Sequence, residues 1–177
     1  MTFYFVQKWT PKMVVDLGHS AAEAAAVLVV ANIGCMLGAI FIGLSSQWVR
    51  LAPTVIGAMV AAFVCVAAIG AWPWSLPAMA IVCACALFFV NAAVVGLYPI
   101  MARTFPSEVR ASGIGFAIGV GRGGAALGPI VAGALLSARR PIGLVSLLMG
   151  SGALVAAVMI VILGRGRTLT PGRESET

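Results

Sequence analysis

Arg122 is the residue of this sequence whose type and position predict a chemical role. It lies within the glycine-rich apolar stretch from Arg110 to Ser137. A guanidinium in hydrocarbon costs a few kcal/mol or more unless it faces a protein interior or a watery cavity. Arg122 follows Arg110 by about 18 Å along a helix, which places it near mid-membrane. We therefore predict an anion site; the alternative is a structural arginine tied to backbone carbonyls or to an acid elsewhere.

Two polar side chains on another apolar segment, Asn91 and Tyr98, are also candidates for binding. They are seven residues apart, so a helix places them on one face. Pro99 follows Tyr98 directly and can free a backbone carbonyl from the helical hydrogen-bond ladder. An amide and a phenol on one face can orient a polar substrate. Hydrogen bonding between helices explains Asn91 equally well.

Glycines at four-residue spacing predict close helix packing in two places. Asn32 stands beside Gly34 and Gly38, so packing is the preferred interpretation of Asn32 and substrate binding is the alternative. Residues 119–124 match the G-x-G-x-x-G pattern of dinucleotide sites, but we expect no strand before them and find no acidic residue about 20 positions later. We instead predict a second packing face there. Its glycines are Gly115, Gly119 and Gly123.

The composition is that of an integral membrane protein. Of the 177 residues, 62% are hydrophobic and only 9% are charged, whereas soluble domains have about 25% charged residues. The mean hydropathy is +1.10. The net charge of +6 is spread over short connections without interleaved aromatics, which argues against a nucleic-acid partner. The four cysteines lie inside apolar runs and read as small hydrophobic residues, with no metal site.

Long apolar stretches between short polar breaks predict an all-α polytopic membrane helix bundle. About 20 apolar residues suffice to cross the hydrocarbon core. Before these stretches, residues 3–9 are apolar but too short to cross, and we expect them to be the last two turns of a helix that ends at Thr10-Pro11. The expected full spans are residues 21–46, 51–71, 76–102, 109–137 and 142–163.

The predicted organisation has three parts. Residues 1–19 are the end of a truncated transmembrane helix and an external loop, residues 20–163 are a bundle of five helices, and residues 164–177 are a disordered cytoplasmic tail. Alternate connections carry six and four basic residues, which places the tail side in the cytoplasm. The cytoplasmic set is Arg50, Arg103, Arg110, Arg165, Arg167 and Arg173, and the opposite set is Lys8, Lys12, Arg139 and Arg140.

A local signal marks the start of the first full span. Ser20 followed by Glu23 has the S-x-x-E pattern of a capping box, in which each residue satisfies a backbone N–H of the other. This pattern makes Glu23 structural. We interpret the neighbouring His19, the single histidine of the chain, as a solvated loop residue rather than a proton carrier.

The sequence resembles major facilitator superfamily transporters. The run FPSEVRASGIG at residues 105–115, continued by GVGR at 119–122 and GP at 128–129, resembles the loop and eleventh helix of that superfamily. Tyr4-Phe5 followed by Trp9-x-Pro11 looks like the end of the seventh helix. The aromatic acid:proton symporters are the most similar members. The resemblance covers nearly the whole chain and corresponds to the C-terminal half of a twelve-helix transporter.

The resemblance implies two three-helix repeats of inverted topology, with substrate bound near the midplane between this half and an N-terminal half. Arg122 would hold a carboxylate by a bidentate pair, and Asn91 and Tyr98 would orient the substrate. Acidic residues tied to proton coupling lie largely in the N-terminal half of similar symporters.

The same resemblance implies gating contacts on the inward side, made by Glu108 with Arg103 and Arg110. Two positions depart from the family pattern. Gln47 stands where the G-x-x-x-D-R motif has its acid, which puts the charge latch in doubt. Lys8 stands where a small polar residue is usual, either as a second anion contact or as a lysine that snorkels to the surface.

We therefore expect a multi-pass inner-membrane protein without a cofactor, the C-terminal half of a proton-coupled symporter for a small organic anion such as an aromatic carboxylate. Its partners would be lipid, protons, the anion and an N-terminal half. One alternative is a truncated or split-gene membrane protein that does not transport alone. Another is a sugar or metabolite permease of the same superfamily. No span carries the residues of an enzyme site.

Overall fold

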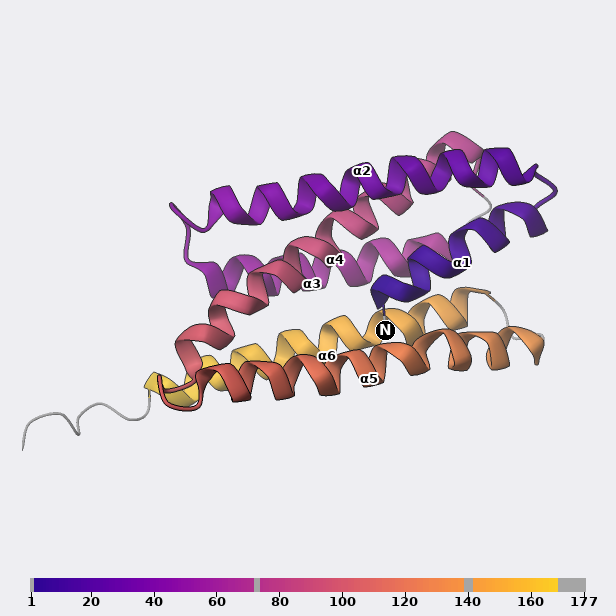
Figure 1. Ribbon diagram of the computed structural model, residues 1–177. Coiled ribbons are helices and arrows are strands. Elements are labelled where there is room, and N and C mark those ends of the chain that lie inside the picture. Colours follow the sequence, from indigo (N-terminus) through magenta and orange to yellow (C-terminus); the bar gives the residue numbers. More distant parts are fainter. Residues whose placement is uncertain (1, 72–73, 139–141, 169–177) are drawn as a thin grey trace, which may run out of the picture.

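The computed structural model describes residues 2–71, 74–138 and 142–168. Its described residues are helical throughout apart from short connections, and successive helices run in opposite directions, so that the connections gather alternately at the two ends of the bundle (Figure 1). Five of the helices are long and apolar enough to cross a membrane. The helices are α1 (Thr2–Asp16), α2 (Ala21–Ser45), α3 (Leu51–Ile69), α4 (Leu76–Thr104), α5 (Arg110–Ser137) and α6 (Ile142–Thr168).

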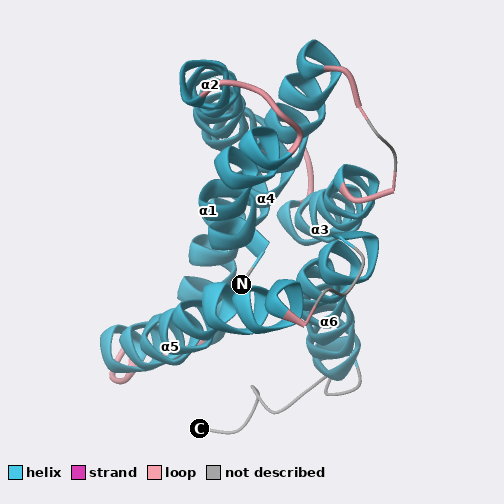
Figure 2. Ribbon diagram, turned by 90° about the vertical axis from the view of Figure 1, so that its right-hand side faces the viewer, coloured by secondary structure: helices cyan, strands magenta, loops and turns pink. Residues whose placement is uncertain are grey.

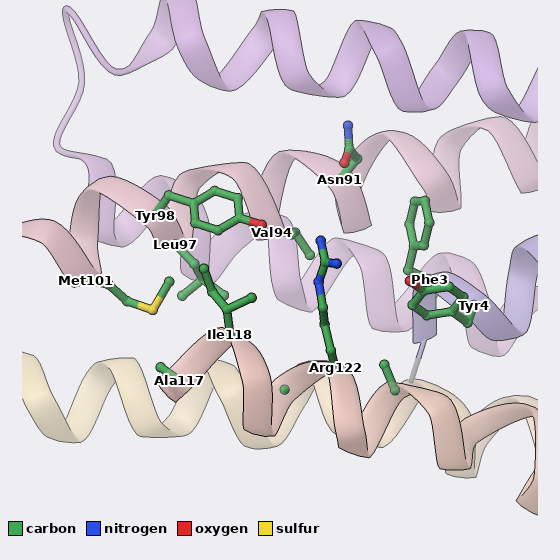
Figure 3. A pocket seen from close by; sticks show the side chains of 12 residues that line it. Phe3, Tyr4, Asn91, Val94, Leu97, Tyr98, Met101, Ala117, Ile118 and Arg122 are labelled. Atoms are coloured by element: carbon green, nitrogen blue, oxygen red, sulfur yellow. The ribbon is translucent and has the colours of Figure 1, made fainter. Parts of the chain in front are cut away.

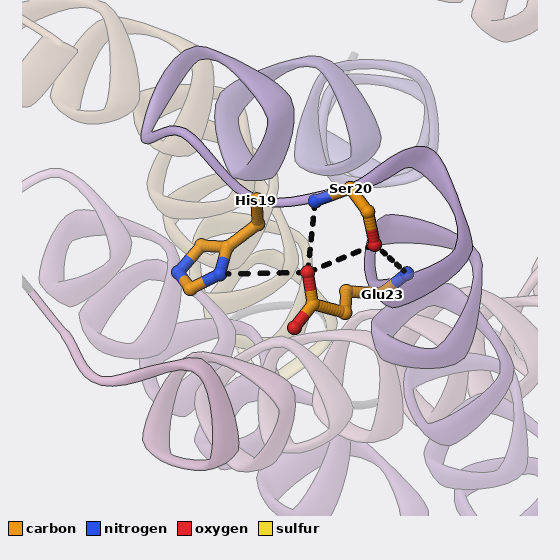
Figure 4. Close-up of polar contacts among 3 residues, drawn as sticks. All are labelled: His19, Ser20 and Glu23. Carbon is orange, nitrogen blue, oxygen red and sulfur yellow. Dashed lines mark hydrogen bonds and ion pairs between the residues drawn. The ribbon is translucent and has the colours of Figure 1, made fainter.

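The start of α2 shows that the predicted capping box is present (Figure 4). The Glu23 amide donates to the Ser20 hydroxyl at 3.3 Å, and the Ser20 amide donates to the Glu23 carboxylate at 2.8 Å. His19 Nδ1 lies 3.7 Å from the same carboxylate oxygen. Two backbone N–H groups that the first helical turn leaves without partners are thereby satisfied.

Helix α4 lies at the centre of the bundle and packs most extensively against α2 and α3. Its close approach to α2 depends on Gly34 and Gly38, as predicted. A Cβ atom at Gly34 would collide with the backbone of Ala84, and one at Gly38 would collide with the backbone of Phe88. Glycine is required at both positions because a neighbouring backbone occupies the space of a side chain.

The predicted end of the first helix at Thr10-Pro11 is wrong, because α1 continues to Asp16 with Pro11 inside it. Proline removes one helical hydrogen bond and disfavours the helix locally. Beyond the proline, Met13 and Val14 are buried in the core shared by α1, α2 and α4. This apolar burial outweighs the local preference, so much of the expected external loop is helical.

The expected start of the disordered tail at residue 164 is also wrong. Helix α6 continues to Thr168, and the rest of the expected tail lies outside the described residues. Arginine is a good helix former, and positive charge near a helix C-terminus interacts favourably with the helix dipole. The sequence at the end of α6, with Arg165 and Arg167, is therefore compatible with continued helix.

The predicted packing face on α5 is not formed within the described part of the chain. No described atom lies within 4 Å of a Cβ built at Gly115, Gly119 or Gly123. Helix α5 lies at the periphery of the bundle (Figure 2) and contacts its neighbours sparsely. Other glycines of α5 do lie close to neighbouring side chains. Gly113 lies beside the Phe105 ring, and Gly133 lies beside Trp9.

Candidate functional site

A cavity of about 400 Å³ lies between α1, α4 and α5 (Figure 3). On α4, Asn91, Val94, Tyr98 and Met101 line it, and their spacing of three or four residues places them on one helical face. Helix α5 contributes the face that carries Arg122. The volume and the mostly apolar lining with a few polar groups are those of a small-molecule site.

The side chain of Arg122 extends from α5 into this cavity, between Tyr98 on one side and Phe3 with Tyr4 on the other (Figure 3). It has neither a hydrogen bond nor an ion pair with any described residue. The structural alternative, an arginine tied to carbonyls or to an acid, therefore has no support in the described part of the chain. Its guanidinium offers N–H donors in a planar fork that matches a carboxylate.

Asn91 both links two helices and lines the cavity. Its Nδ2 donates to the carbonyl of Cys35 on α2 at 2.7 Å, so it links two helices. It also lines the cavity, on the same face as Tyr98. The Tyr98 ring lies along α4 with its hydroxyl directed toward the Arg122 side (Figure 3). Asn91, Tyr98 and Arg122 are thus brought together as expected.

Asn32 lies outside this cavity. Its Oδ1 accepts from Gln7 Nε2 on α1 at 3.1 Å, and its Nδ2 donates to the Leu28 carbonyl at 2.8 Å. Both ends of the amide are engaged between α1 and α2, which fits the packing interpretation. Lys8 does not line the cavity either.

The three residues expected to gate the site lie at or near the connection between α4 and α5, away from the cavity lining. The Ser107 hydroxyl donates to Glu108 Oε1 at 3.0 Å. The pKa of the Glu108 carboxyl is held below its usual range by its own backbone N–H and then by this hydroxyl. Arg110 Nε donates to the Phe105 carbonyl at 3.4 Å, and Arg103 lies in the last turn of α4.

Sequence reasoning missed the aromatic end of the cavity. Phe3 and Tyr4 line it from α1, with ring centroids 5.7 Å apart and nearly perpendicular planes. The sequence pattern indicates only that they belong to the end of a helix. A consecutive aromatic pair near a candidate anion contact is the available signal, but only the fold shows that α1 begins beside α5 (Figure 1).

Comparisons with known proteins find aromatic acid transporters. A gallate transporter of Pseudomonas putida is 30% identical over 171 residues, which cover 94% of this chain and 37% of that protein. The relatives of this chain are major facilitator superfamily transporters. No family model matches it, and no solved structure matches it significantly.

Other superfamily relatives also have aromatic acids in their names. A benzoate transport protein of Acinetobacter baylyi is 27% identical, over 95% of this chain and 36% of its own length. A 3-(3-hydroxy-phenyl)propionate transporter of Escherichia coli is 27% identical, over 92% of this chain and 40% of its own length. The chain thus spans about two fifths of the length of these relatives, consistent with a C-terminal half. Its five apolar helices and its transporter homologues make it a multi-pass membrane protein.

Proposed function

We propose that the chain forms the C-terminal half of a secondary transporter that carries a small aromatic carboxylate together with protons. One observation supports this most strongly: Arg122, without a described partner, projects into a cavity with aromatic walls. The names of the relatives favour an aromatic acid over a sugar as the substrate. The charge asymmetry of the connections supports an inner-membrane location with the C-terminus in the cytoplasm.

In the proposed complex, the carboxylate binds the Arg122 guanidinium by two parallel hydrogen bonds. The aromatic ring lies against Phe3 and Tyr4, where flat apolar surfaces are matched. Asn91 and Tyr98 contact the opposite edge of the ring and set its orientation. Once an N-terminal half covers the cavity, this charge-assisted pair becomes stronger than one in water, because the local dielectric constant is lower.

Transport requires a second bundle, because alternating access moves two bundles about a shared site. In this proposal the N-terminal half packs against α5, where no described atom lies within 4 Å of a Cβ built at any glycine from Gly115 to Gly124. Protons bind acidic residues of that half, and Glu108 with Arg103 and Arg110 closes the cytoplasmic side. The chain alone is then a membrane protein without transport activity.

Uptake of radiolabelled benzoate tests the proposal. The chain is produced in cells alone and together with the N-terminal half of a superfamily relative. We expect uptake only with both halves, and we expect Arg122→Lys to weaken it and Arg122→Ala to abolish it, because lysine lacks the planar fork. Arg50→Ala, in the connection between α2 and α3, is the control that preserves uptake. Saturable uptake by the chain alone, or full uptake by Arg122→Ala at equal protein level, contradicts the proposal.

A further inference from the structure

Asn91 presents a fixed atom to the cavity. The Cys35 carbonyl can only accept a hydrogen bond, so the group that lies 2.7 Å from it must be the NH2 of the Asn91 amide. This bond joins α2 to α4 within the packed region where Gly34 brings the two backbones together. The amide is therefore held with Nδ2 toward α2 and cannot flip without losing the bond.

The consequence is that Nδ2 is directed toward α2, while Oδ1 remains able to accept a hydrogen bond from a ligand. In Figure 3 the nitrogen of Asn91 points toward α2 and the oxygen lies on the other side of the amide. No described group donates a hydrogen bond to this oxygen. An amide oxygen accepts hydrogen bonds and cannot donate them. At this position the cavity therefore favours a ligand that brings a donor.

The other polar groups of the cavity do not select for a ligand that donates a hydrogen bond. Arg122 can only donate, and it suits the carboxylate end of a ligand. The hydroxyls of Tyr4 and Tyr98 can donate or accept, so they do not discriminate between ligand donors and acceptors. Among the polar side chains that line the cavity, Asn91 is the one with an oxygen that can only accept.

We propose that Asn91 Oδ1 recognises a ring hydroxyl and makes the site selective for hydroxylated aromatic carboxylates over unsubstituted ones. This inference rests on the proposed function, since it places the carboxylate on Arg122. The ring spans the cavity between the two residues, with its hydroxyl donating to Asn91 Oδ1. A neutral hydrogen bond of this kind corresponds to about threefold to tenfold in affinity.

Binding to the purified 177-residue chain in nanodiscs, measured by calorimetry, tests the inference. The ligands are benzoate, 3-hydroxybenzoate, 4-hydroxybenzoate and their methoxy counterparts, in which the hydroxyl hydrogen is replaced by a methyl group. We expect at least one hydroxybenzoate to bind about threefold to tenfold more tightly than benzoate and than its methoxy counterpart. This comparison uses the unmodified chain, so it does not depend on the folding of a variant.

Two variants assign the preference to Asn91. Asn91→Leu should lower the hydroxyl preference to about onefold while benzoate still binds, because the contact to Arg122 remains. Asn32→Leu is the matched control: it removes another interhelical amide bond outside the cavity and should leave the preference unchanged.

The possible outcomes separate the inference from the proposed function. If benzoate and all hydroxybenzoates bind equally well, the selectivity is wrong while carboxylate binding stands. A preference that persists in Asn91→Leu, or that disappears in Asn32→Leu as well, also overturns the assignment to Asn91. If none of the ligands binds to the chain alone, this inference is refuted; the proposed function fails only if uptake by the two halves together is absent as well.

Discussion

Replacement of Gly34 by alanine should separate α2 from α4 and measurably destabilise the bundle. A Cβ atom at Gly34 would lie within 3.0 Å of three atoms of Ala84, and all three belong to the backbone. No change of rotamer can relieve that overlap, so the helices must move apart. Overpacking of a tightly packed interior costs about 1–3 kcal/mol.

The separation has a second cost, because the next residue, Cys35, accepts the 2.7 Å hydrogen bond from Asn91. A typical net contribution of such a bond is about 1 kcal/mol. Together the two effects give an expected loss of about 2–4 kcal/mol for Gly34→Ala. Gly43, on the same helix, has space for a side chain, since no described atom lies within 4 Å of a Cβ placed there. Gly43→Ala should therefore be neutral or stabilise by up to about 1 kcal/mol.

Unfolding of the two purified variants by sodium dodecyl sulfate in mixed micelles, followed by circular dichroism, gives both free-energy changes. The difference between them isolates the steric effect, because each variant adds one methyl group to α2. If Gly34→Ala is as stable as Gly43→Ala, the close approach of α2 and α4 is refuted, and with it the fixed orientation of Asn91.

Two further predictions concern the membrane topology and the start of α2. Reporter fusions should place Thr177 in the cytoplasm and Gly18 outside it, because the basic residues of the connections are unequally divided; an external signal at Thr177 would reverse the orientation and the gating roles of Arg103, Glu108 and Arg110. Ser20→Ala should lower the free energy of unfolding by about 1 kcal/mol through loss of the helix cap, and an unchanged unfolding curve would show that the cap contributes nothing.

The membrane helices were predictable because hydrophobic length and local capping determine them. Helices α2 to α5 begin and end within about two residues of the expected positions. The end of α1 was not predictable in this way, since Pro11 gives a strong local signal against helix. The burial of Met13 and Val14 that overrides this signal appears only once α2 and α4 are in place.

The candidate site was predictable in part. Arg122, Asn91 and Tyr98 were identified because polar side chains in apolar helices are expensive and therefore informative. The partner of Asn91 and the contribution of Phe3 and Tyr4 depend on contacts between residues far apart in the sequence. For the glycines of α5 the sequence predicted a contact that the described chain does not make. Their spacing indicates a helix-packing face, but it does not show whether the partner helix belongs to this chain.

The central claim is that Arg122 is the carboxylate contact of an aromatic-lined cavity. The most direct test is the affinity of benzoate for the purified chain and for Arg122→Gln, which keeps a polar side chain without the charge. Loss of a hydrogen-bonded pair with a charged group should weaken binding by at least about tenfold. Equal benzoate affinity for both proteins, at equal thermal stability, would contradict the claim.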